Sequence, residues 1–106
     1  MVAPSRGAIF WLEMEREGRH PACVLTRDEA IPRLEKIVVA SVSSRIRGLP
    51  SEARLGREDG MPRECAVSLD NVRTVPKGLL TEPITKLSPQ RMDDVCRALS
   101  LATSCG

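Results

Sequence analysis

Apolar runs separated by polar turn segments organise this chain, and the most strand-like of them opens the stretch 37–50. The run begins with β-branched residues, which favour extended structure. It ends in two hydroxyls and two guanidiniums, from Ser43, Ser44, Arg45 and Arg47, before glycine and proline stop the strand. A buried strand with such groups at its exposed end would hold anion-recognising side chains rigidly. We therefore expect function at that end.

Several shorter segments also have the composition of strands. They are 7–14, 20–26, 52–55, 65–69, 72–75 and 83–87. The segments between them are predicted to be turns or single helical turns, at 15–19, 27–32, 56–63 and 76–80. Asp70 and Asn71 are expected to make a tight connection between two of the strands, because both residue types favour turns.

The C-terminal segment has the pattern of an amphipathic helix. Ser88 is a good N-cap, and Pro89 follows at the first helical position, where proline is tolerated. One apolar stripe at helical spacing consists of Met92, Val95, Cys96 and Leu99. Many short strands and one terminal helix predict a mainly β α+β fold, a small curled antiparallel sheet or barrel with the helix packed on it.

Composition limits the size and the class of the protein. With 106 residues, 42% hydrophobic and 28% charged, the chain is predicted to be one soluble globular domain, its core spanning about 6–102. The net charge of +2 permits a nucleic-acid partner without requiring one. Phe10 and Trp11 are the only aromatic residues, which argues against a platform that stacks several bases. We expect Trp11 in the core or at a dimer interface.

The four cysteines do not have the spacing of a metal or redox motif. The chain contains no CxxC pair, and its single histidine is too few for a zinc-finger set. We expect reduced thiols and a cytoplasmic protein without a membrane span, because the apolar run 8–12 is too short for a signal or a span. Cys23, Cys65 and Cys96 are expected to fill the core, and Cys105 to be exposed.

Five blocks, in order, carry a resemblance to a known family. They read GAIFWLEM, GRHPACVLT, IVVASVSSRIRGLP, CAVSLDNVRTVPKGLL and ITKLSPQRMDDVCRAL. Together they resemble the MazF/PemK family of toxin–antitoxin ribonucleases, also called mRNA interferases, over about residues 6–101. The resemblance implies an SH3-like barrel with a C-terminal helix, a homodimer, and a cognate antitoxin that covers the RNA groove. It also implies cleavage of single-stranded RNA without a metal or other cofactor: the ribose 2′-OH attacks the adjacent phosphate and leaves cyclic phosphate and 5′-OH ends.

The resemblance also implies a set of catalytic residues, with one departure. The family uses a hydroxyl at the end of the central strand, here Ser43, and an arginine before the second-strand proline. Here His20 precedes that proline and the arginine is Arg19. Either His20 is the general acid or base with Arg19 clamping phosphate, or the hairpin shifts and Arg19 takes the usual role. Glu15 matches an acidic position of this loop, where it would act as a base or orient His20.

The remaining matched positions are predicted to contact RNA. Ser44, Arg45 and Arg47 would bind phosphates, and Asp70 with Arg73 matches the family's D-x-x-R-T block, which would support the groove and touch RNA. Each residue also has a plain structural interpretation: a strand terminator, a solvated arginine, a surface carboxylate or a turn former.

Two other functions stay open at this stage. One is a non-catalytic toxin of the same fold that binds a protein target such as DNA gyrase, as CcdB-like proteins do. Ser43 beside Arg45 favours the nuclease over that alternative. The other is a degenerate family member that only binds RNA or antitoxin, which the histidine at position 20 keeps open.

Overall fold

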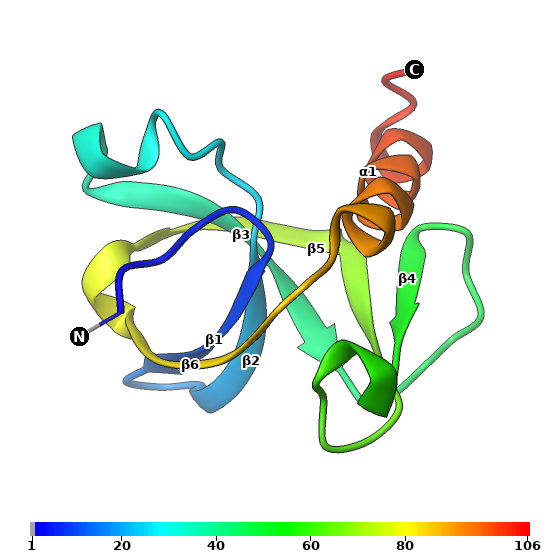
Figure 1. Ribbon diagram of the computed structural model, residues 1–106, viewed down its shortest axis with the longest axis horizontal. Helices are drawn as coiled ribbons and strands as arrows, with labels where there is room; N and C mark the ends of the chain where they lie inside the picture. Colours follow the sequence, from blue (N-terminus) through cyan, green and yellow to red (C-terminus); the bar gives the residue numbers. More distant parts are fainter. Residues whose placement is uncertain (1) are drawn as a thin grey trace.

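The computed structural model describes residues 2–106 as one curled antiparallel sheet with a helix against it (Figure 1). Six strands lie in the order β4-β5-β3-β2-β1-β6. Their bounds are β1 Ala8–Met14, β2 Gly18–Val24, β3 Lys36–Ser43, β4 Glu52–Leu55, β5 Cys65–Pro76 and β6 Leu80–Lys86. Single helical turns are η1 Ile31–Arg33, η2 Arg57–Asp59 and η3 Lys77–Leu79, and the helix is α1 Pro89–Thr103. The predicted fold class is confirmed, with the sheet forming a half-barrel.

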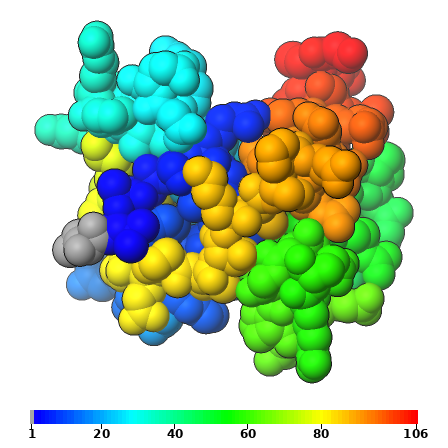
Figure 2. Space-filling view, in the orientation of Figure 1, coloured from blue at the N-terminus to red at the C-terminus, as the bar shows by residue number. Residues whose placement is uncertain are grey.

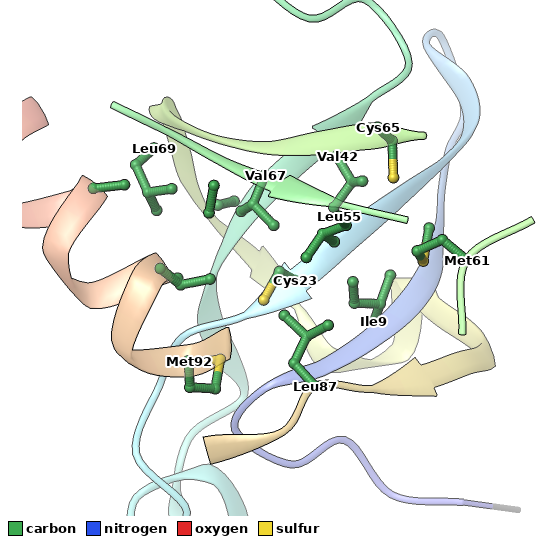
Figure 3. Close-up of a cluster of buried hydrophobic side chains, with 14 residues drawn as sticks. Ile9, Cys23, Val42, Leu55, Met61, Cys65, Val67, Leu69, Leu87 and Met92 are labelled. Atoms are coloured by element: carbon green, nitrogen blue, oxygen red, sulfur yellow. The ribbon is translucent and has the colours of Figure 1, made fainter. Parts of the chain in front are cut away.

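Strand alternation divides the buried side chains between two hydrophobic clusters. Neighbouring residues of a strand point to opposite faces of the sheet, so Ile9 joins one cluster and Phe10 the other. The cluster of Phe10 also takes Leu12, Val24, Ile37, Val39 and Val75 from the curled strands. The cluster of Ile9 lies between the other face and helix α1, and it includes the cysteine, methionine and aliphatic side chains labelled in Figure 3.

The expected turn at Asp70 and Asn71 is wrong. These residues lie inside one continuous strand, β5, which pairs with β3 on both sides of them. The pairing passes from Ala40 opposite Val72 to Ser41 opposite Ser68, so extra residues of β5 bulge out of the ladder. Turn-forming residues are also bulge-forming residues. Here the shared partner strand β3 determines which of the two structures forms.

Helix α1 begins as predicted, but its buried stripe differs. The Ser88 hydroxyl accepts a hydrogen bond from the Arg91 backbone N–H at 3.1 Å, which caps the first turn. Met92, Val95 and Ala98 are the buried positions, whereas Cys96 is exposed. The expectation that Cys96 fills the core is therefore wrong, because the buried stripe passes through Ala98 instead. None of the helices in residues 2–106 has the length and apolarity needed to cross a membrane.

Gly60 occupies a position where any side chain would collide with the sheet. It ends η2 with φ +88°, and an added Cβ would overlap the Thr85 hydroxyl, which donates a hydrogen bond to the Asp59 carbonyl at 2.9 Å. We expect Gly60→Ala to lower the free energy of unfolding by about 2–3 kcal/mol, from left-handed backbone strain and loss of that hydrogen bond.

The matched control for this variant is Gly18→Ala. Gly18 has a similar φ of +75°, but an added Cβ there would meet nothing within 4 Å. It should therefore cost only the backbone strain, about 1 kcal/mol. Urea unfolding of both variants measures the difference. Equal losses would show that Thr85 does not restrict position 60.

Candidate active site

A pocket of about 340 Å³ opens at the end of β3. Its lining comes from three parts of the chain: Trp11, His20 and Pro21 from β1 and β2, Val42, Ser43 and Ser44 at the end of β3, and Met61, Pro62, Arg63 and Cys65 from the segment that leads into β5. Of the residues expected to be functional, the structure thus brings together His20, Ser43 and Ser44.

The pocket exists because β2 and β3 diverge. These strands pair only from Ala22 opposite Ser41 to Val24 opposite Val39. The residue before Ala22 is Pro21, which has no N–H to continue a ladder. Beyond it β2 remains paired with β1, while the end of β3 pairs with β5. The gap between the two separating strands is the pocket.

The hydroxyl of Ser43 is oriented by the backbone that follows it. Its oxygen accepts a hydrogen bond from the Arg45 backbone N–H at 3.0 Å, and the side chain is exposed. Because the oxygen accepts, the O–H hydrogen remains able to donate to a ligand. The loop beyond is held by Glu52, which accepts from the backbone N–H groups of Arg47 at 3.1 Å and Leu49 at 3.0 Å. The side chains of Arg45 and Arg47 are exposed on this loop.

Arg19 does not line the pocket. Its Nη2 donates to Glu82 Oε2 at 3.1 Å, and its guanidinium lies 4.4 Å from the centre of the Trp11 ring. His20, the next residue of β2, is among the residues that line the pocket. Of the two arrangements considered from the sequence, the geometry of the pocket is compatible with the one in which His20 handles protons.

Glu17, in the turn before β2, is paired with Arg73 of β5. It accepts two hydrogen bonds from Arg73, both at 2.8 Å, and these lower the pKa of Glu17, with a smaller contribution from the charge of His20. Glu15 lies exposed in the same turn. The Glu17–Arg73 pair joins residues far apart in the sequence, so nothing in the local pattern distinguished Glu17 from its acidic neighbours.

Asp70 lies away from the pocket and anchors the loop that follows β3. Its carboxylate accepts a short hydrogen bond from the hydroxyl of Ser51, which is buried, and the Leu69 backbone N–H donates to the Ser51 carbonyl at 3.0 Å. The bulge of β5 thus fixes the start of β4. The expected contact of Asp70 with RNA and its support of the groove stay predictions.

The residues around the pocket combine three chemical abilities. An imidazole can move protons near neutral pH, an oriented hydroxyl can donate a hydrogen bond, and a guanidinium can stabilise a negative oxygen. Arg63, one of the lining residues, is the arginine of the pocket, and it was not among the residues selected from the sequence. In residues 2–106, no three His, Cys, Asp or Glu side chains are grouped so as to hold a metal ion.

Thiol reactivity tests the burial of this region. Burial raises the pKa of Cys23 to about 12 and also raises the pKa of Cys65, whereas Cys96 and Cys105 are exposed. A raised pKa leaves the thiol protonated and unreactive at pH 8. We expect iodoacetamide at pH 8 to label Cys96 and Cys105 quickly, and the two buried cysteines only after unfolding, as measured by peptide mass spectrometry. Rapid labelling of Cys23 in the folded protein would contradict its burial.

Comparisons with known proteins converge on one family. Residues 5–103 match the model of the PemK-like, MazF-like toxins of type II toxin–antitoxin systems. The chain is 44% identical over 103 residues to the probable endoribonuclease MazF5 of Mycobacterium tuberculosis, covering 96% of this chain and 94% of that protein. It is 26% identical to endoribonuclease EndoA of Bacillus subtilis, covering 92% and 91%.

Solved structures agree with these sequence matches. The M. tuberculosis toxin MazF-mt6 superimposes with a TM-score of 0.86 at 25% identity, covering 93% of this chain and 98% of that one. A mycobacterial endoribonuclease in complex with its cognate antitoxin superimposes with a TM-score of 0.88, covering 98% of both chains. At 21% identity, the second match supports the fold alone.

Proposed function

Because the chain belongs to the PemK-like, MazF-like toxin family of type II toxin–antitoxin systems, we propose that it is an endoribonuclease that cleaves single-stranded RNA at a short sequence motif. The relative at 44% identity, a probable endoribonuclease, supports this function. The structural observation that supports the proposed function most directly is the pocket that brings Ser43 of β3 together with His20 of β2. We propose further that the protein acts in the cytoplasm as a homodimer and is held inactive by a cognate antitoxin.

The proposed reaction needs no metal because the RNA supplies its own nucleophile. The ribose 2′ oxygen forms a bond to the adjacent phosphorus, the bond from phosphorus to the 5′ oxygen breaks, and the products are a 2′,3′-cyclic phosphate and a 5′-OH. One proton must leave the 2′-OH and one must reach the departing 5′ oxygen. His20 is the residue of the pocket suited to carrying one of these protons.

The other residues of the pocket would stabilise the extra charge on the phosphate. Ser43 is oriented to donate its O–H to a phosphate oxygen, and Arg63, which lines the same pocket, would bring a guanidinium to it. Arg45 and Arg47, exposed on the adjoining loop, would hold neighbouring phosphates, with Ser44 between them and the catalytic serine. Glu17 pairs with Arg73 and would thereby hold the hairpin that carries His20, while Glu15 keeps its predicted role as a base or as the group that orients His20.

The decisive experiment is digestion of a long, unstructured RNA by the purified protein in EDTA, with the new ends mapped and identified. Discrete cuts that leave 5′-OH ends would establish the reaction and give the recognition motif. If a folded, antitoxin-free protein makes no cuts but binds RNA, the degenerate binding member suggested by the histidine before Pro21 becomes the better assignment. His20→Arg is then the next variant, because restored cleavage would identify that residue as the cause.

A further inference from the structure

Much of the wall of the pocket is apolar, although the groups that act on a phosphate are all polar. Trp11, Pro21, Met61 and Pro62 line it beside the polar groups. Val42 and Cys65, which also line it, belong with Met61 to the buried cluster drawn in Figure 3. Ligand pockets that combine apolar walls with a few polar groups bind flat organic groups and orient them. In an RNA substrate, the flat apolar group next to a phosphate is a nucleobase.

The indole of Trp11 is fixed in place from outside the pocket. Arg19 lies over the ring at 4.4 Å from its centre, and Glu82 holds that guanidinium at 3.1 Å. A cation over an aromatic face is attractive, so Arg19 restrains the ring. Arg19 itself does not reach the pocket, although Trp11 does. Within the single chain the ring is half-buried, so it is not fully enclosed in the core, and the alternative expectation, a place at a dimer interface, stays a prediction.

We propose that this pocket binds the nucleobase next to the cleaved phosphate, with Trp11 as the wall on which the base stacks. Arg19 is then a positioning residue that acts through the indole, and not a phosphate clamp. The proposal rests on the proposed function, because it takes RNA as the ligand. At about 340 Å³ the pocket is near the lower end of the range for ligand sites, roughly 300–1,000 Å³, which suits one base and not a stack.

The composition of the chain makes this proposal directly measurable. Trp11 is the only tryptophan and the chain has no tyrosine, so the intrinsic emission of the protein reports on this ring alone. The probe is a fully 2′-O-methylated RNA of random sequence, which lacks the attacking hydroxyl and stays intact. Binding is followed separately by the anisotropy of a dye on the RNA. At saturation we expect the emission of Trp11 to fall and its quenching by acrylamide to decrease.

RNA probes that each lack one base show which base contacts Trp11. Once cleavage has given the motif, the probe is the motif with a 2′-deoxy residue at the cleaved position and one abasic residue at each position in turn. Removing a base adjacent to the cleaved phosphate should restore the emission of Trp11, whereas removing distant bases should not. Trp11→Leu should weaken binding of the intact motif by roughly 5- to 150-fold, the range for loss of one stacked base. Trp11→Leu should not weaken binding of the motif that already lacks the base adjacent to the cleaved phosphate.

Arg19→Gln tests the positioning role, with Arg16→Gln as the matched control. Both remove one positive charge from the same hairpin, but only Arg19 touches the indole. Arg19→Gln should shift the emission of Trp11 in the absence of RNA, and Arg16→Gln should not. Equal weakening of RNA binding by both variants, with no change of emission, would show that Arg19 contributes charge alone and would overturn its assigned role.

The outcomes separate this inference from the proposed function. Specific cleavage together with unchanged Trp11 emission in the saturated complex overturns the base pocket and leaves the ribonuclease standing. Binding that quenches Trp11 without any cleavage supports the pocket and overturns the enzymatic function. A loss of binding in Trp11→Leu that is the same for intact and abasic motifs also overturns the proposal. Thermal melting of each variant shows whether it is folded.

Discussion

We expect Ser43→Ala and His20→Ala each to lower the rate of RNA cleavage by about 100- to 10,000-fold, in a protein that stays folded and still binds antitoxin. This is the usual contribution of one group that transfers a proton or stabilises charge in the transition state. Both residues line the pocket, and neither is part of the buried core, so stability should change little. Cleavage rates of an RNA that contains the mapped motif, measured under single-turnover conditions, give the loss directly.

The control for the serine is Ser41→Ala. Ser41 precedes Ser43 by two residues on β3 and shares its face of the sheet, but it does not line the pocket. It should cut RNA at nearly the normal rate. Full activity of both Ser43→Ala and His20→Ala would show that the pocket is not the catalytic site. A loss in Ser41→Ala as large as that in Ser43→Ala would show that the strand, and not the hydroxyl, is what matters.

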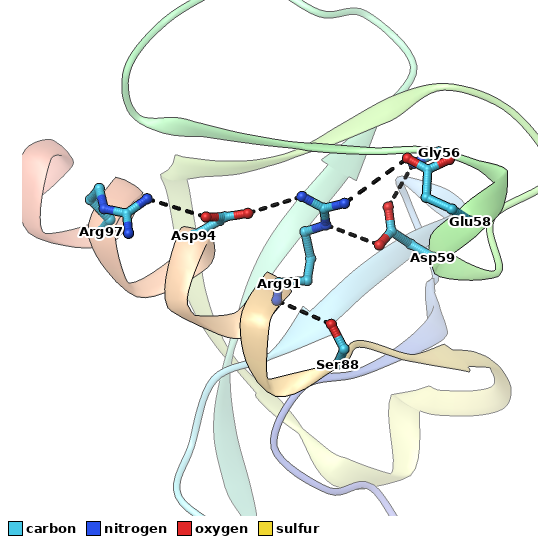
Figure 4. A network of polar contacts seen from close by, with 7 residues as sticks. All are labelled: Gly56, Glu58, Asp59, Ser88, Arg91, Asp94 and Arg97. Carbon is cyan, nitrogen blue, oxygen red and sulfur yellow. Dashed lines mark hydrogen bonds and ion pairs between the residues drawn. The ribbon is translucent and has the colours of Figure 1, made fainter.

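The second large effect is expected on stability, from Arg91 in helix α1. Its guanidinium bonds the Asp59 carboxylate at 2.9 Å and Asp94 at 2.9 Å (Figure 4). The side chain of Asp59 is only 7% exposed, and it also accepts from the Gly56 backbone N–H at 2.9 Å. Arg91→Gln leaves a buried carboxylate without its counter-charge. We expect the free energy of unfolding to fall by about 2–4 kcal/mol.

The same helix offers the control. Arg97 also pairs with Asp94, at 3.2 Å, but its side chain is 70% exposed. Exposed ion pairs contribute little, so Arg97→Gln should change stability by less than about 0.5 kcal/mol. Urea unfolding followed by circular dichroism compares the two. Adding Asp59→Asn to Arg91→Gln should recover part of the loss, because the unpaired charge disappears. Equal effects of the two arginine variants would mean that the contact between η2 and α1, visible in Figure 2, rests on packing alone.

Local patterns predicted the strands and the helix because their causes are local. Ser88 caps α1 as its residue type predicts, and 52–55 forms β4 with the predicted bounds. The bulge at Asp70 and Asn71 was not predictable in this way. The same residues suit a hairpin turn, and only pairing of both halves of β5 with β3 decides between the two. Likewise β6 extends back to Leu80 because β1 offers it a partner along that length.

The residues of the candidate site that are placed by their position along one strand could be predicted from the sequence. The residues that are placed by partners elsewhere in the fold could not. Ser43 and His20 were selected as candidates and do meet at the pocket. Arg19 and Trp11 could not be assigned from the sequence, because their arrangement depends on Glu82, which lies in β6. Glu17 differs from Glu15 only through its pairing with Arg73 of β5. Arg63 reaches the pocket because η2 and the residues after it fold over the end of the sheet.

The pairing of β1 with β6 has a consequence for synthesis of the protein. Strand β1 finds one of its two neighbours in residues 80–86, about 70 positions further along the sequence. A ribosome must therefore deliver the chain at least as far as residues 80–86 before the sheet is complete, and such distant pairings also slow folding. A chain released early, before residue 80, lacks the strand that flanks Trp11 and Leu12 and the glutamate that holds Arg19. Chains that end before residue 80 should consequently be incompletely folded and easily degraded.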